Sequence, residues 1–265
     1  MQTLQQIIHT LQEKDEVVAM LLTGSLGDGT ATKNSDIDLI IILKDNSQNI
    51  ESIFTWIDGV FADIYFFDLE NIKKVSEMAW IPENISEAKH KMTPLLYDWL
   101  KKGEIRFDKS GELTKLKSIQ KDIKISQEKQ WESWVNTNYN FETNSRYFNA
   151  NDSKYHEALE IRLLYSVVKL ITTYFDFINM PWRGEKNAIT YLKEHDNDFY
   201  QNFIQYTKSA SLDEKFKNYS SMTRHVFELN QKYPLWQKDE IIPRSQKGEF
   251  EINNNLVEFW KKLSK

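Results

Sequence analysis

The segment that most constrains the fold is residues 36–43, with the sequence DIDLIIIL. Its isoleucine-rich run predicts a β-strand over residues 37–43. Because residues two apart on a strand point to the same face, the carboxylates of Asp36 and Asp38 are expected to converge where the strand begins. Two anions that close raise each other's pKa unless a cation lies between them, and hard oxygen ligands suit Mg²⁺. Taken singly, either aspartate would be a cap or a surface charge.

A third aspartate, Asp63, stands inside the apolar run VFADIYFF at residues 60–67, which predicts another strand. A buried polar group without a partner costs about 2–7 kcal/mol, and an ionised one costs more. A metal site shared with Asp36 and Asp38 would remove that cost if the two strands are neighbours. The alternative is an edge-strand residue that faces water.

A glycine-rich turn precedes the first of these strands. Gly24, Gly27 and Gly29 are three of the eight glycines in the chain. Glycine allows a close approach of the backbone to a ligand, backbone N–H groups in such a turn can bind an anion, and the Ser25 hydroxyl can donate to a phosphate oxygen. The turn lacks the lysine of a Walker A loop and the spacing of a dinucleotide-binding loop. A plain turn would explain one or two of the glycines, whereas a phosphate cradle beside a carboxylate metal site is typical of phosphoryl or nucleotidyl transfer.

The pattern of apolar residues divides the chain into two parts. Before residue 113, apolar spacing predicts helices over 2–14 and 69–80 and strands over 17–22 and 105–107, in addition to the two strands above. After it, helical spacing dominates, with helices expected over 155–178 and 185–194. The sequence therefore predicts a part with mixed strands and helices over 1–112 and a helical part over 113–265.

Composition narrows the functional classes. The 265 residues are 40% hydrophobic and 28% charged, and they include no cysteine, which excludes thiolate catalysis and cysteine-bound zinc. Residues 1–112 hold 11 basic and 19 acidic residues, a net charge of −8. This negative charge argues against binding of nucleic acid and is compatible with binding of a metal ion or a cationic ligand. An ordinary uneven distribution of charged surface residues explains it as well. Short apolar runs and a start without signal-peptide features predict a cytoplasmic protein with no membrane partner.

Gly24-Ser25, ten intervening residues and then Asp36-Ile37-Asp38 within SDIDL resemble the signature of the DNA polymerase beta-like nucleotidyltransferase superfamily. Asp63 matches the third carboxylate of that family. The resemblance is greatest to small bacterial enzymes that adenylylate aminoglycoside and lincosamide antibiotics. It implies an α+β fold, with a nucleotidyltransferase-type mixed sheet and flanking helices at residues 1–112 as the catalytic domain. An all-helical bundle at residues 113–265 would then bind the substrate.

The resemblance also implies roles for individual residues. The catalytic and metal-binding residues would be Asp36, Asp38 and Asp63, which would hold two Mg²⁺ ions. Gly24 and Ser25 would bind the triphosphate of ATP or another nucleoside triphosphate. A basic residue of the helical part would assist them, either Lys186 or, as the second choice, Arg183. The general base would be Asp63 or a glutamate of the helical part, such as Glu157 or Glu160. One departure is Asp28, which stands where relatives often carry arginine and is expected to face solvent or a cationic group.

The expected activity is transfer of a nucleoside monophosphate, AMP from ATP, onto a hydroxyl of a small molecule. A cationic antibiotic of the aminoglycoside type or a lincosamide is the expected substrate class. Two alternatives stay open, namely adenylylation of a protein or RNA end, as antitoxins of this family do, and a non-catalytic nucleotide sensor. The protein is expected to be a monomer or a homodimer.

Overall fold

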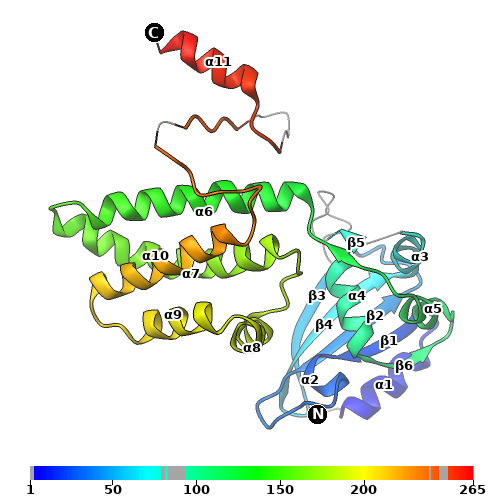
Figure 1. Cartoon of the computed structure of the whole chain (residues 1–265). Helices are drawn as coiled ribbons and strands as arrows, with labels where there is room; N and C mark the ends of the chain where they lie inside the picture. Colours follow the sequence, from blue (N-terminus) through cyan, green and yellow to red (C-terminus); the bar gives the residue numbers. More distant parts are fainter. Residues whose placement is uncertain (1–2, 79–80, 83–92, 239, 245–249, 265) are drawn as a thin grey trace. The chain divides into compact units, whose positions relative to one another are not determined.

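The structure is a computed structural model that describes residues 3–78, 81–82, 93–238, 240–244 and 250–264. It contains two compact units, Met1–Ile123 and Lys124–Lys265 (Figure 1). The sequence pattern placed a boundary at residue 112. In the structure the helix α5 (Glu112–Ser118) packs against the first unit, where Leu113 and Leu116 are buried in its core.

The first unit is built on a five-stranded mixed sheet with the strand order β3-β4-β2-β1-β6. Strands β2 and β4 are parallel, and the other neighbouring pairs are antiparallel. The strands are β1 (Val17–Thr23), β2 (Ile37–Leu43), β3 (Ser52–Ile57), β4 (Val60–Asp68) and β6 (Glu104–Asp108). The short strands β5 (Ile81–Pro82) and β7 (Ile123–Lys124) form a separate pair. The central strands β1 and β2 are almost entirely buried, which fits their apolar sequences.

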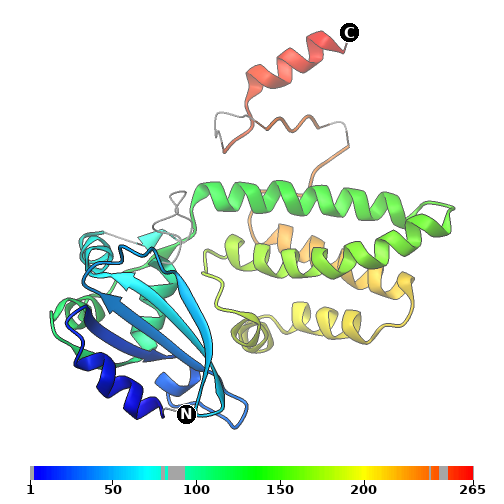
Figure 2. The same cartoon turned by 180° about the vertical axis from the view of Figure 1, so that it is seen from behind.

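Helices cover both faces of this sheet. The helix α1 (Leu4–Gln12) packs with Ile8 on one face, against alternate residues of the strands such as Leu39 and Ile41. The opposite face carries α3 (Leu69–Glu77), α4 (Thr93–Lys102) and α5, which bury Ile40 and Ile42. Figure 1 shows α4 in front of the sheet, and Figure 2 shows α1 from the other side. The four-residue helix α2 (Gly24–Gly27) follows β1 directly.

The second unit is helical. Its helices are α6 (Gln127–Phe148), α7 (Ser153–Phe177), α8 (Glu185–His195), α9 (Asn197–Lys208), α10 (Leu212–Glu228) and α11 (Asn254–Leu263). The long helices α6 and α7 lie side by side (Figure 2). Aromatic side chains such as Trp131, Trp134 and Tyr219 are buried in its core. Side chains of Asp152, Asp196 and Ser211 cap the starts of α7, α9 and α10, which is why these helices begin where they do. Among the described residues, no helix has the length and apolar character needed to cross a bilayer.

A polar cluster joins α6 to α7 inside this unit. The buried carboxylate of Asp176 accepts a hydrogen bond from Ser133 Oγ at 2.5 Å and lies 3.4 Å from Lys129 Nζ. Lys169 Nζ donates to the same serine hydroxyl at 3.1 Å. Burial lowers the pKa of Lys169, while the charge of Asp176 opposes that shift. The two helices are thus held together by an ionic network as well as by apolar packing.

The α+β fold with a helical C-terminal region, predicted from the sequence, is confirmed. The predicted strand at 37–43 is present with those bounds, and those at 17–22, 60–67 and 105–107 differ by one or two residues. Strand β3 and helix α4 were not predicted. Strand β3 has a mostly exposed apolar sequence, SIFTWI, which lacks the continuous buried run of β1 and β2.

Candidate acidic site at the start of strands β2 and β4

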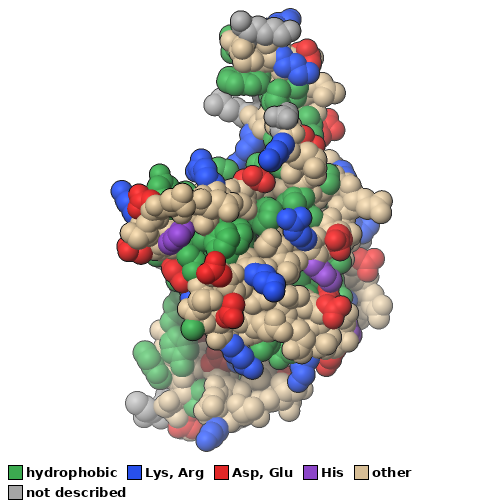
Figure 3. Space-filling model, turned by 60° about the vertical axis from the view of Figure 1, so that its left-hand side comes forward, with side chains coloured by type: hydrophobic (Ala, Val, Ile, Leu, Met, Phe, Trp, Pro, Cys, Tyr) green, Lys and Arg blue, Asp and Glu red, His purple; other side chains and the backbone are tan. Residues whose placement is uncertain are grey.

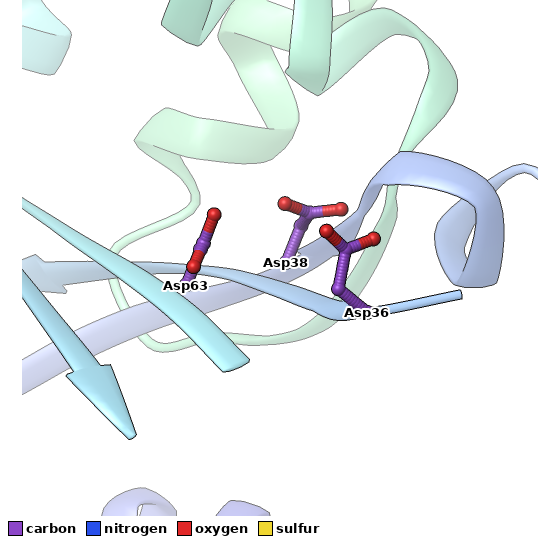
Figure 4. A group of neighbouring side chains, drawn as sticks. All are labelled: Asp36, Asp38 and Asp63. Atoms are coloured by element: carbon purple, nitrogen blue, oxygen red, sulfur yellow. The ribbon is translucent and has the colours of Figure 1, made fainter. Parts of the chain in front are cut away.

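Three carboxylates meet on one face of the first sheet. In the parallel pairing of β2 with β4, Asp38 lies directly opposite Asp63, and Asp36 stands two residues before Asp38. One carboxylate oxygen from each residue lies within 4.8 Å of the other two. Figure 4 shows all three side chains on the same side of the sheet. The convergence predicted from the spacing of these residues is therefore present, and it depends on β4 being the direct neighbour of β2.

The carboxylate of Asp63 is partly buried. Its Oδ1 atom is buried and accepts no hydrogen bond from any residue that the structure describes. Burial raises the pKa of Asp63, and the charge of Asp36 raises it further. An ionised carboxylate in this position needs a positive charge nearby. A divalent cation fits the site, because three carboxylates supply hard oxygen ligands and the buried Oδ1 is left with an open acceptor position.

The glycine turn is in direct contact with this cluster. Gly24 has a φ of +61°, in the left-handed region, and it starts α2 at the end of β1. A Cβ atom added to Gly24 would lie 1.9 Å from Asp38 Oδ2, far inside van der Waals contact. Only glycine fits here, because both the backbone conformation and the neighbouring carboxylate exclude a side chain. The turn and the acidic cluster therefore form one site.

The C-terminal end of α4 packs against the glycine turn. Thr23, the last residue of β1, donates its hydroxyl to the backbone oxygen of Trp99 at 3.1 Å. A Cβ atom on Gly27 would lie 2.4 Å from the Leu22 carbonyl oxygen and 3.2 Å from the Cα of Gly103. This close packing fixes the backbone of the turn against the sheet and α4.

The loop after α2 is closed by its own side chains. Asp28 Oδ1 accepts hydrogen bonds from the backbone N–H and the hydroxyl of Thr30, at 3.0 and 2.6 Å. The hydrogen bond from the Thr30 hydroxyl is the main reason why the pKa of Asp28 is lowered. Asp28 is exposed, and Ser25 of α2, which is predicted to bind phosphate, is half-buried. Asp28 stands where the resembled family often carries arginine, and its side chain stabilises the loop through its hydrogen bonds with Thr30.

The remaining candidate residues belong to the second unit. Arg183 and Lys186 flank the start of α8, and both are exposed. Arg183 lines a pocket of about 180 Å³ together with Trp182 and Tyr191. Their role toward a triphosphate stays a prediction. Of the two glutamates considered as bases, Glu157 is exposed and Glu160 forms an ion pair with Lys215 at 2.8 Å.

Several residues near the cluster were missed by the sequence analysis. Tyr65 lies two positions after Asp63 on β4, and its ring packs against Trp99 with a centroid distance of 4.7 Å. Burial raises the pKa of Tyr65, and the charges of Asp63 and Asp38 add to the shift. Alternation along β4 could have identified this face, since Phe61, Asp63 and Tyr65 are spaced two apart.

Comparison with known proteins finds a family match within the first unit. Residues 5–112 match the family model described as Polymerase beta, Nucleotidyltransferase. Among solved structures, the chain is similar to a nucleotidyltransferase-like protein from Exiguobacterium sibiricum 255-15, with 12% identity and a TM-score of 0.47, over 98% of this chain and 87% of that one. No curated protein matches the sequence. The family match covers residues 5–112, so this part of the chain is similar to the nucleotidyltransferase domains of the polymerase beta family.

Proposed function

We propose that the protein transfers a nucleoside monophosphate, AMP from ATP, onto a hydroxyl group of a small molecule. The observation that carries this proposal is the contact between the glycine turn and the acidic cluster. Gly24 lies against Asp38, and Asp38 lies opposite Asp63. A site that binds phosphate at one end and divalent cations at the other has the parts that nucleotidyl transfer requires.

Each part of the site has a distinct task in this proposal. The carboxylates of Asp36, Asp38 and Asp63 would hold two Mg²⁺ ions, which supply charge neutralisation and Lewis acidity at the reacting phosphate when bound. Backbone N–H groups of the turn and the hydroxyl of Ser25 would bind the β- and γ-phosphates. The fixed backbone of the turn keeps these donors in place before the substrate arrives, so little ordering is needed on binding.

Two further roles fall to other residues. A basic side chain of the second unit, Lys186 or Arg183, would neutralise the triphosphate. The proton of the attacking hydroxyl would pass to a carboxylate, and Asp63 is favoured over the two glutamates. Glu160 already pairs with Lys215, while Asp63 has a buried oxygen with an open acceptor position and belongs to the acidic cluster itself.

The acceptor is proposed to be a hydroxylated small molecule, with aminoglycosides and lincosamides as the first compounds to test. The net charge of −8 over residues 1–112 favours a cationic acceptor. On the face drawn in Figure 3, acidic and basic side chains are interspersed, unlike the basic stripe typical of nucleic-acid binding. The complete set of three aspartates also favours catalysis over nucleotide sensing alone.

The proposal is tested by following label from each α-³²P nucleoside triphosphate in the presence of Mg²⁺. Acceptors would include an antibiotic panel, total RNA and cell protein. Asp36→Asn and Asp38→Asn are expected to reduce transfer by at least about 10²-fold, because each removes a ligand charge at the reacting centre. The matched control is Asp58→Asn, the same charge change in the turn between β3 and β4, where the backbone already has a φ of +53° that asparagine accepts.

Transfer to a small molecule that depends on Asp36 and Asp38 supports the proposal. Label on RNA or protein would instead support the macromolecular acceptor. Nucleotide binding with no transfer to any acceptor would support the sensor.

A further inference from the structure

Three aromatic side chains extend the acidic face of the sheet onto its edge. Phe54 and Trp56 of β3 pair in register with Asp63 and Phe61 of β4. Paired residues of antiparallel strands share a face, so Phe54, Trp56 and Phe61 lie on the same face as Asp63. The rings contact one another, with centroid distances of 6.4 Å for Phe54–Phe61 and 5.4 Å for Trp56–Phe61. We call these three residues the aromatic platform.

The platform is exposed. The exposed fraction is 58% for Phe54, 64% for Trp56 and 40% for Phe61. Exposed apolar side chains that gather on one surface mark binding sites more often than singly scattered ones do. An edge strand also invites pairing with other chains, and exposed rings on it add to that hazard. A ligand that contacts these rings would account for their presence beside the acidic cluster.

The order of the strands places the platform on a defined side of the cluster. The phosphate turn follows β1 and touches Asp38 on β2, while the platform begins at β4 beside Asp63 and continues onto β3. In nucleotidyl transfer the attacking oxygen and the leaving pyrophosphate lie in line on opposite sides of the α-phosphorus. With the triphosphate on the β1 side, the acceptor must approach from the side of β4 and β3.

We propose that the aromatic platform is the acceptor subsite, and that it binds a cationic hydroxylated ring of the sugar or aminocyclitol type. This inference rests on the proposed function. The apolar C–H face of such a ligand can stack on the indole of Trp56. Its ammonium groups can form cation–π contacts with the aromatic side chains and are attracted by the neighbouring carboxylates. A hydroxyl of the stacked ring then points toward Asp63, where the proton is removed.

Fluorine NMR of Trp56 tests this directly in the full chain labelled with fluorotryptophan. The chain has eight tryptophans, and Trp56→Phe assigns the resonance. The probes are α,β-methylene-ATP with Mg²⁺, followed by kanamycin, streptomycin or lincomycin at millimolar concentration. We expect the Trp56 resonance to shift saturably with at least one ring compound, and little with the nucleotide alone.

Calorimetric titration with the same compound supplies the second readout. Trp56→Ala is expected to weaken its binding by about tenfold, and Trp56→Tyr to restore most of the affinity. The control is Ile53→Ala on the same strand, because Ile53 pairs with Ile64, points to the opposite face and is 43% exposed. It should change the affinity by less than about twofold, as surface changes away from a site usually do.

Three outcomes would overturn the inference. No shift with any of the ring compounds removes the acceptor role. A shift with the nucleotide alone assigns the platform to the base. A shift with protein concentration alone assigns it to contact between copies of the chain. Failure of the proposed function is recognised separately, since Mg²⁺-dependent transfer of the α-³²P label to a small molecule would then be missing in the parent protein, whatever the Trp56 resonance does.

Discussion

Gly24 and Asp38 are in contact in a way that leaves no room for a side chain, because an added Cβ atom would lie 1.9 Å from the Asp38 carboxylate oxygen. These residues come from different segments, the end of β1 and the start of β2, which are antiparallel neighbours. The contact joins the two parts of the candidate site, so that a change at the glycine disturbs the carboxylate.

Gly24→Ala should therefore reduce Mg²⁺-dependent nucleotide binding by at least about tenfold, because the new methyl group displaces the Asp38 carboxylate. Gly29→Ala is the matched control. Gly29 also has a positive φ, +78°, but no atom within 4 Å of its added Cβ. Both variants should lose about 1–2 kcal/mol of unfolding free energy from backbone strain. Equal nucleotide affinities of the two variants would show that the contact with Asp38 does not contribute to nucleotide binding.

Asp63→Asn should have opposite effects with and without metal. The pKa of Asp63 is raised in the folded protein, so its ionisation costs stability as the pH rises through the unfolded value near 4 toward the folded value. Without metal at neutral pH the variant should melt at a higher temperature than the parent.

Saturating Mg²⁺ should stabilise the parent by about 2.7 kcal/mol at 100 times Kd, and the variant much less. Calorimetric melts with EDTA and with Mg²⁺ check both parts. A variant that is less stable in EDTA would contradict the electrostatic explanation.

Much of this site could be predicted from local sequence. The isoleucine run predicted β2, and the two-residue spacing predicted that Asp36 and Asp38 share one face. The adjacency of β4 to β2 could not be derived, because strand order depends on packing of the whole sheet. The contact of Gly24 with Asp38 depends on another pairing, that of β1 with β2. The aromatic platform was missed because strand β3 exposes apolar residues on both of its faces, a pattern that burial alone does not explain.

Asp108→Ala should destabilise the first unit by about 1–2 kcal/mol. Asp108 Oδ1 accepts from Ser110 and Gly111, and Oδ2 accepts from both the N–H and the hydroxyl of Thr114 at 2.8 Å. Burial would raise the pKa of Asp108, but these hydrogen bonds outweigh it and lower the pKa.

The pH dependence of this contribution follows from the lowered pKa. The stabilisation is complete above the unfolded pKa near 3.9 and is lost as the pH falls through the lower folded value. The difference in denaturant midpoint between the parent and Asp108→Ala should therefore shrink in acid. Asp45→Ala, at an exposed position, is the control and should be neutral. A difference that persists unchanged at pH 2 would argue against the hydrogen bonds as its source.

Asp176→Ala should destabilise the second unit by about 3–5 kcal/mol, because it leaves the half-buried Lys169 and the buried Ser133 without their carboxylate. Urea unfolding followed by tryptophan fluorescence measures the loss. The double variant Asp176→Ala with Lys169→Met should recover part of it, since the unpaired charge is removed. Recovery close to zero would show that Lys169 is not coupled to Asp176.

The most direct test of the central claim is a crystal structure with Mn²⁺ and α,β-methylene-ATP, in which anomalous scattering locates the ions. We predict peaks at metal–oxygen bonding distance from Asp36, Asp38 and Asp63, with the triphosphate against the Gly24–Ser25 turn. Mn²⁺ bound elsewhere, or a triphosphate away from the turn with the three carboxylates unliganded, would contradict the account.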